Sequence, residues 1–355
     1  MNDSRISRSL ERAGLRSSSF FAKTTTGYAR CVPAALLLSL SICVGHGAAQ
    51  PSADESGAED KDAGALHVAV RELSYFNFDR SYELFAALRA RAQPKQGDLW
   101  QEATLGLALS AHSCTPSSAE LMAEAGALYR ELADPRLHSR FAPRALLQLG
   151  RIAEVRDYGG DEVDLPSAIG FYESVYEKWP ELHIADEAVM RHGMALTQQF
   201  DQPQAIQAGI DLMQSWVGAH EDRPLASSIY EAIGWSRLKF QDDAAGAVAA
   251  FLKADSLGLV DSSVAGQLYF RIAALADQRT GDLKTAARYY QKVIRETPRS
   301  GRAFEAQLAL RRLAEAHPDA AIVVPEISLL GGDADAAEAE LNPTSPPQSQ
   351  PEAQP

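Results

Sequence analysis

Two histidines and an aspartate near the start of one predicted helix could form a metal-binding group. His183 and Asp186 are separated by two residues, and His192 follows on the same helix. Imidazole nitrogens together with a carboxylate are ligands that Zn²⁺ accepts. The alternative is that Asp186 caps the helix and that both histidines lie on the surface. We favour this alternative, so the sequence predicts no metal site.

A second group of carboxylates lies between residues 156 and 164. Asp157, Asp161, Glu162 and Asp164 could bind Ca²⁺ through their oxygens, but their spacing differs from that of a calcium-binding loop. Acidic insertions of this kind are usually solvated loops. Asp164 is also well placed to cap a helix that begins near Pro166. We therefore interpret this segment as a polar loop with a helix cap at its end.

The remaining reactive side chains form no pattern that is typical of catalysis. Cys114 has no base at a fixed spacing, and the sequence lacks the motifs of serine-nucleophile, phosphate-binding, dinucleotide-binding and zinc-protease sites. Tryptophans could stack on a ligand, but at helical spacing in a repeat they are more often part of the core. They are Trp100, Trp179, Trp216 and Trp235. The sequence predicts no catalytic residue and no cofactor.

The elements that must position these side chains are helices. Over residues 64–320, apolar residues recur with helical period in stretches of about 13 to 18 residues. Short polar breaks separate the stretches. Most breaks contain a proline, which a helix tolerates in its first turn but not in its interior. The sequence therefore predicts an all-α domain over residues 64–320.

Pairs of these stretches repeat one another. Residues 164–180 and 282–298 carry the same four residue types at the same offsets. These are Ala168, Tyr172, Val175 and Pro180 in the first segment, and Ala286, Tyr290, Val293 and Pro298 in the second. Weaker copies begin near residues 81, 125, 205 and 247. The helix before a copy carries a small residue, which would let the two helices approach closely. Examples are Gly106, Gly150, Gly193 and Gly234.

This pattern resembles the tetratricopeptide repeat (TPR) family, in which a helix with a Leu-Gly pair precedes a helix with Ala, an aromatic residue and a closing Pro. The Ala-x-Glu-Ala that follows Pro180 and Pro298 is similar to bacterial cell-envelope members, such as the barrel-assembly lipoprotein and the cell-division coordinator. The resemblance covers about 250 residues. It implies a right-handed superhelix of about six TPR-like helical hairpins plus a C-terminal capping helix.

Two details qualify this resemblance. The copies lie 37 to 44 residues apart, whereas the family's period is about 34 residues, so the superhelix is expected to be less regular. Residues 300–316 are expected to form the capping helix. Its apolar face would carry Phe304, Leu308 and Leu313, and Arg311 and Arg312 would lie on another face.

The resemblance also implies where a partner binds, because this family binds peptides in a concave groove lined by its first helices. Aligning the Leu-Gly positions places a mixture of methionine, tryptophan, arginine and acidic residues on that face, which suits an adaptable peptide groove. The candidate partner-binding residues are Arg144, Arg151, Glu187, Met190, Met194, Glu231, Trp235, Arg271 and Gln278. The alternative is that about half of this face packs against neighbouring helices.

The two ends of the chain differ from its middle. Residues 1–49 carry six basic and two acidic residues, an apolar run at 32–44, and small residues at Gly47 and Ala49. This is the pattern of a secretory signal peptide cleaved after Ala49, with an uncleaved N-terminal anchor as the alternative. Residues 50–63 are small and acidic and predict a flexible linker. Residues 321–355 predict a disordered, proline-rich acidic tail.

The charge of the rest of the chain restricts its partners. After residue 49 there are 45 acidic and 28 basic residues, which argues against nucleic acid or anionic lipid as a partner, apart from a membrane tether through the N-terminal segment. We expect a periplasmic or envelope-associated scaffold that binds a protein or peptide. Alternatives are a non-catalytic helical part of a cell-wall-processing or outer-membrane assembly or secretion complex, and a solute-binding helical protein.

Overall fold

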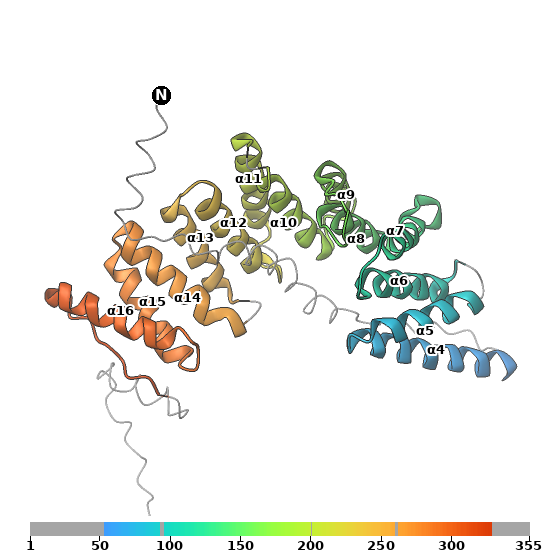
Figure 1. Cartoon of the computed structure of the whole chain (residues 1–355), viewed down its shortest axis with the longest axis horizontal. Coiled ribbons are helices and arrows are strands. Elements are labelled where there is room, and N and C mark those ends of the chain that lie inside the picture. The colour runs from blue at the N-terminus through green and yellow to red at the C-terminus, as the bar shows by residue number, and fades with distance from the viewer. Residues whose placement is uncertain (1–52, 93–95, 200, 260–261, 329–355) are drawn as a thin grey trace, which may run out of the picture. The chain divides into compact units, whose positions relative to one another are not determined.

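The described part of the chain is all-helical, as the sequence predicts. The computed structural model describes residues 53–92, 96–199, 201–259 and 262–328. These residues form thirteen α-helices, α4 to α16, with no strand among them (Figure 1). The predicted leader, residues 1–49, lies outside this part, as does the tail after residue 328. Within the described ranges, no helix is both long and apolar enough to span a bilayer.

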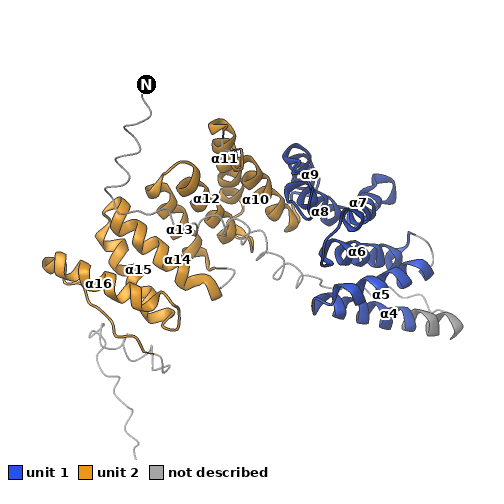
Figure 2. Cartoon of the chain, viewed as in Figure 1, with its two compact units in different colours: residues 1–180 blue, residues 181–355 orange. Residues whose placement is uncertain are grey.

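The chain divides into two compact units, one ending at Pro180 and the other beginning at Glu181 (Figure 2). In the first unit each helix packs against the next along the chain. Its helices are α4 (Ala53–Ser74), α5 (Phe78–Arg91), α6 (Asp98–Ser113), α7 (Ala119–Ala133), α8 (Ala142–Glu154) and α9 (Leu165–Lys178). The core of this unit is built from apolar residues of all six helices.

The second unit repeats this arrangement. Its helices also pack in chain order, and α10 additionally contacts α12. They are α10 (Ile184–Thr197), α11 (Pro203–Ala219), α12 (Ala226–Phe240), α13 (Ala244–Leu257), α14 (Ala265–Leu275), α15 (Leu283–Glu296) and α16 (Ala303–Ala316). Helix α14 continues into a π-helical turn, Ala276–Thr280. Neighbouring helices therefore pack in a repeating pattern in both units.

An aspartate cap begins three of these helices in the same way. Asp164, Asp243 and Asp282 each accept a hydrogen bond from the backbone N–H three residues further on, at 2.8–3.1 Å. This bond satisfies one of the N–H groups that the first turn of a helix leaves unpaired. The caps lie at the starts of α9, α13 and α15. The sequence-based prediction that Asp164 caps a helix is thereby confirmed.

Glycines let several helix pairs approach closely. A Cβ atom built on Gly150 would lie 2.3 Å from the ring of Tyr172 on α9, and one on Gly234 would lie 2.4 Å from Phe251 on α13. These distances leave no room for any side chain. Gly106 was expected to serve α6 and the helix after it, but it faces Phe85 on α5. Helix α6 therefore makes its closest glycine contact with the helix before it.

A buried tyrosine recurs next to these contacts. Three tyrosine hydroxyls reach a polar group near the end of the preceding helix, at 2.7–3.5 Å. The pairs are Tyr129 with His112, Tyr172 with Glu154, and Tyr290 with Asp277. Tyr129 and Tyr172 are fully buried, and Tyr290 almost so. This polar contact joins neighbouring helices across cores that are otherwise apolar.

Three segments differ from the sequence-based predictions. Helix α4 begins at Ala53 and so covers most of the predicted linker, residues 50–63. On α16, Phe304 is 62% and Leu308 44% exposed, whereas Leu310 is fully buried. The expected apolar face of the capping helix was therefore wrong for Phe304 and Leu308 and confirmed for Leu313, because α16 buries alanines together with Leu310 and Leu313. Residues 321–328 were expected to be disordered, but several of their side chains pack on the apolar core of unit 2.

Candidate binding site

Two of the predicted groove residues meet between α12 and α14. The guanidinium of Arg271 lies 5.3 Å from the centre of the Trp235 ring. The indole also contacts Phe251 edge-on, with ring centres 5.2 Å apart. Trp235 is half-buried and Arg271 is exposed. A cation over an indole face is favourable in itself. The pair presents an aromatic edge and a positive charge together at the surface.

The other candidates in unit 2 lie in different environments. Glu187 is only 1% exposed and accepts a hydrogen bond from Arg191 at 2.8 Å, so its carboxylate is held inside the fold. Met190 is half-buried against the apolar core of α11 and α12. Of the remaining three, Met194 and Glu231 are half-buried and Gln278 is exposed.

The candidates in unit 1 lie on α8. Arg144 and Arg151 are both half-buried. Arg151 contributes positive potential around His112, Tyr129 and Asp157. Its positive charge therefore acts on three polar side chains inside unit 1. Among the nine predicted residues, Trp235 and Arg271 form an arginine–aromatic contact between two helices.

Sequence reasoning missed two exposed apolar side chains on α16. Phe304 and Leu308 lie one helical turn apart and are 62% and 44% exposed. The signal for Leu308 was present, since aligning the Ala-x-Glu-Ala junctions matches it to Met190. Beside them, the guanidinium of Arg302 lies 5.2 Å from the ring centre of Phe270 on α14. Arginine–aromatic contacts therefore recur from α12 through α14 to the start of α16.

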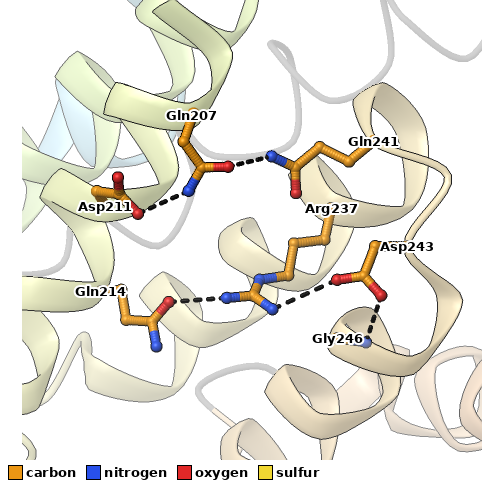
Figure 3. A network of polar contacts seen from close by, with 7 residues as sticks. All are labelled: Gln207, Asp211, Gln214, Arg237, Gln241, Asp243 and Gly246. Carbon is orange, nitrogen blue, oxygen red and sulfur yellow. Dashed lines mark hydrogen bonds and ion pairs between the residues drawn. The ribbon is translucent and has the colours of Figure 1, made fainter. Parts of the chain in front are cut away.

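A polar network fixes α12, the helix that carries Trp235, against its neighbours (Figure 3). Arg237 donates to Gln214 of α11 at 2.9 Å and to Asp243, the cap of α13, at 3.4 Å. Gln241 donates to Gln207 of α11 at 2.6 Å. Glutamine and arginine side chains thus join three consecutive helices. The network holds the backbone beneath Trp235 in place.

The residues considered for a metal site have other roles. The Asp186 carboxylate, 1% exposed, accepts from the indole N–H of Trp216 at 2.9 Å and from Arg223 at 3.0 Å. His183 is exposed, and burial lowers the pKa of His192. In the part of the chain that the structure describes, no three His, Cys, Asp or Glu residues are grouped so as to hold a metal ion. Asp186 thus acts as an internal ion-pair partner and not as a helix cap.

The acidic loop of unit 1 lies beside a largely buried histidine, His112. Asp161 accepts from the backbone N–H of Asp157 at 2.9 Å. A carboxylate oxygen of Asp157 lies 3.9 Å from Nε2 of His112. Burial, aided by Arg151, lowers the pKa of His112 to about 3, and burial raises the pKa of Asp157 to about 6. The imidazole is therefore neutral at pH 7, when the carboxylate is ionised.

Cys114 is buried at the end of α6. Its Sγ donates to Asp79 at 3.6 Å. Burial, together with this carboxylate, raises the pKa of the thiol to about 11. A thiol with so high a pKa stays protonated at neutral pH and is a poor nucleophile.

Comparisons with known proteins do not assign the chain to a family, so its fold and this surface are the basis for a functional assignment. No model of a known protein family matches the chain, and no curated protein matches its sequence.

Proposed function

We propose that the chain is a TPR-like scaffold that binds a protein or peptide partner on a surface of α12, α14 and α16. The helices pair as six hairpins in this proposal. They are α4–α5, α6–α7, α8–α9, α10–α11, α12–α13 and α14–α15, and α16 follows them. Aspartate caps at the starts of α9, α13 and α15 support this pairing, because they mark the second helix of three pairs.

Three close glycine contacts support the same pairing, whereas Gly106 contacts Phe85 across the boundary between α4–α5 and α6–α7. Gly150 meets Tyr172 within α8–α9, Gly193 meets Met213 within α10–α11, and Gly234 meets Phe251 within α12–α13. The large residue lies on the second helix each time. A repeat of this kind stacks hairpins that cannot bury their apolar faces alone. The first helices of such a stack line the surface on which TPR proteins bind partners.

The observation that carries the proposal is the exposed apolar and cationic character of this surface. Trp235 and Arg271 lie at first-helix positions, where the resemblance places the groove. Phe304 and Leu308 are exposed on α16, the helix that follows α15. Exposed apolar side chains that lie next to one another mark interaction sites more often than isolated ones do. Tryptophan and arginine are also the residues that contribute most to binding energy at interfaces. The fitting partner is a peptide with apolar side chains and at least one carboxylate.

We place this function in the cell envelope on the basis of the leader pattern in residues 1–49. N-terminal sequencing of the protein recovered from the periplasm tests this. A mature start at Gln50 supports a cleaved signal, a retained leader supports an anchor, and recovery from the cytoplasm refutes export. A role within a larger envelope complex and the binding of a solute remain the alternatives. A solute-binding protein would show thermal stabilisation by a small molecule.

Site-specific photo-crosslinking tests the binding surface directly. A photo-reactive amino acid is placed at Arg271 or Leu308, and at Ala249, an exposed position on α13, as the control. The proposal predicts a discrete adduct from Arg271 and Leu308 in cells that express the protein from its own promoter. No adduct of that mass is expected from Ala249. Equal adducts at all three positions, or none at Arg271 and Leu308, would refute it.

A further inference from the structure

The segment after α16 turns back across unit 2. We call residues 321–328 the strap. A short 3₁₀ turn, Pro318–Ala320, ends the helical region, and Ala321 then adopts a left-handed backbone conformation with φ of 48°. This conformation is unfavourable for a residue with a Cβ atom, and here it reverses the chain. The strap returns along α16 (Figure 1).

Two glutamine side chains hold the strap by its backbone. Gln291 of α15 donates from its amide to the carbonyl oxygen of Val323 at 2.7 Å. Gln307 of α16 donates to the carbonyl oxygen of Pro325 at 2.9 Å. Gln307 is 5% exposed, so its amide is aimed at the strap from inside the fold. These bonds recognise an extended backbone and do not depend on the side chains that it carries.

The side chains of residues 322–324 alternate between the core and solvent, and Ile327 contacts the core again three residues later. Ile322, Val324 and Ile327 pack against the apolar core of unit 2. Val323, between the first two, is 61% exposed. Alternation of this kind is expected of an extended chain lying on a surface. The three packed side chains are only half-buried, so the strap is held less firmly than the helices beneath it.

We propose that the surface of α15 and α16 under the strap is a binding site for an extended peptide, and that the strap is its intrachain occupant. The fitting partner is an extended segment with β-branched or aliphatic residues at the spacing of Ile322, Val324 and Ile327, and with free backbone carbonyls for Gln291 and Gln307. Such a segment displaces the strap when it binds. The strap then acts as an autoinhibitory ligand that sets a threshold concentration for the partner.

Tethering explains why the strap dominates in the absence of a partner. A segment joined by a short linker has an effective concentration of about a millimolar, so a free peptide with the same contacts competes poorly until the strap is weakened. The proposal concerns a site separate from Trp235 and Arg271. Its failure would leave the proposed scaffold function untouched, and the reverse also holds.

The test uses the full-length chain and a fluorescent peptide of residues 318–328. A released variant carries Ile322→Ser, Val324→Ser and Ile327→Ser. Fluorescence anisotropy is expected to show binding to the released variant at least about tenfold tighter than to the wild-type chain, because the intrachain competitor has been weakened. A peptide with the same three serines serves as the control and should not bind. Adding Gln307→Ala to the released variant should weaken binding about tenfold.

The outcomes are decisive in either direction. The proposal is overturned if the peptide binds the released variant and the wild-type chain equally, or if the serine peptide binds as well as the original peptide. It is also overturned if the peptide does not bind a released variant that has a wild-type circular dichroism spectrum. If the released variant does not fold, hydrogen exchange on the wild-type chain gives the answer. An excess of peptide carrying Val323→Ala, distinguishable by mass, should accelerate exchange of the strap amides. Unchanged exchange at saturating peptide would also overturn the proposal.

Discussion

The contact between α10 and α11 gives a sharp prediction, because two backbones meet there without a side chain between them. A Cβ atom on Gly209 would lie 2.4 Å from the carbonyl oxygen of Gly193 and 3.0 Å from the Cβ of Leu196. A backbone carbonyl cannot change rotamer to make room. The substitution Gly209→Ala must therefore push the two helices apart.

The expected magnitude follows from two opposing effects. Overpacking a close contact costs about 1–3 kcal/mol, and a contact with a backbone atom belongs near the upper end. Alanine in place of glycine within a helix returns about 0.5–1 kcal/mol. We expect Gly209→Ala to lower the free energy of unfolding by about 2 kcal/mol. Gly218→Ala on the same helix should raise it by a few tenths, since no atom lies within 4 Å of its new Cβ.

Urea unfolding followed by circular dichroism and by tryptophan fluorescence measures both variants against the wild type. The fluorescence sums four tryptophans, of which Trp216 lies on α11. The variants differ only in which face of α11 carries the new methyl group. If Gly209→Ala proves as stable as Gly218→Ala, the inference of close backbone packing between α10 and α11 is wrong.

Three further predictions concern buried polar groups. Burial lowers the folded-state pKa of His112, so the stabilising contribution of its neutral imidazole is lost as pH falls below about 6.5. Between about pH 7.5 and 5, the free energy of unfolding of the wild type should fall by about 2 kcal/mol more than that of His112→Gln. Urea titrations at the two pH values measure this difference. Asp186→Ala removes the buried carboxylate that accepts from Trp216 and pairs with Arg223, and should cost about 3 kcal/mol, measured by thermal unfolding. Tyr172→Phe removes the donor to the buried Glu154 and should cost about 1–2 kcal/mol, with Tyr75→Phe, at a tyrosine that is 73% exposed, as the comparison.

Each of these predictions has a clear failure. Parallel pH profiles of His112→Gln and the wild type would show that the imidazole is protonated in the fold. The carboxyl of Asp157, whose pKa is raised, acts in the opposite direction but contributes equally to both proteins. A loss under about 1 kcal/mol in Asp186→Ala would mean that the ion pair adds little. An unchanged unfolding midpoint in Tyr172→Phe would mean that the hydrogen bond from Tyr172 to Glu154 adds little stability.

The helices of this chain could largely be predicted from its sequence, because local signals mark them. Prolines and aspartate caps lie at the helix starts, and Asp164 was identified as a cap from its position before Pro166 alone. Apolar periodicity and small residues such as Gly150 indicated that helices pack closely in pairs. These signals act over a few residues, so a single sequence reveals them.

The remaining features depend on contacts that are distant in sequence. Asp186 has the position of a cap, but Trp216 and Arg223 turn it into a buried ion-pair partner. On α16 both faces carry apolar residues, so periodicity alone could not decide that Leu310 is buried and Leu308 exposed. The start of α4 lacks an apolar stripe, although alanine and acidic residues are acceptable in helices.

The candidate surface was predicted only in part. The alignment on Leu-Gly positions found Trp235 and Arg271, which meet across α12 and α14. It also selected Glu187, which the fold buries. The strap escaped prediction because it was grouped with the proline-rich tail that follows it, although four of its eight residues are isoleucine or valine. Its packing depends on Gln291 and Gln307, whose roles no local pattern reveals.

The central claim is that a partner binds the surface of α12, α14 and α16. Isothermal titration calorimetry with the purified crosslinked partner tests it most directly. The titration compares the wild-type chain with a double variant that carries Trp235→Ala and Arg271→Ala. Arg130→Ala, at an exposed arginine on α7, serves as the control. We predict that the double variant loses at least about tenfold in affinity, as expected for a pair central to an interface, while the control binds like the wild type. Unchanged affinity in a double variant with a wild-type circular dichroism spectrum would contradict the claim.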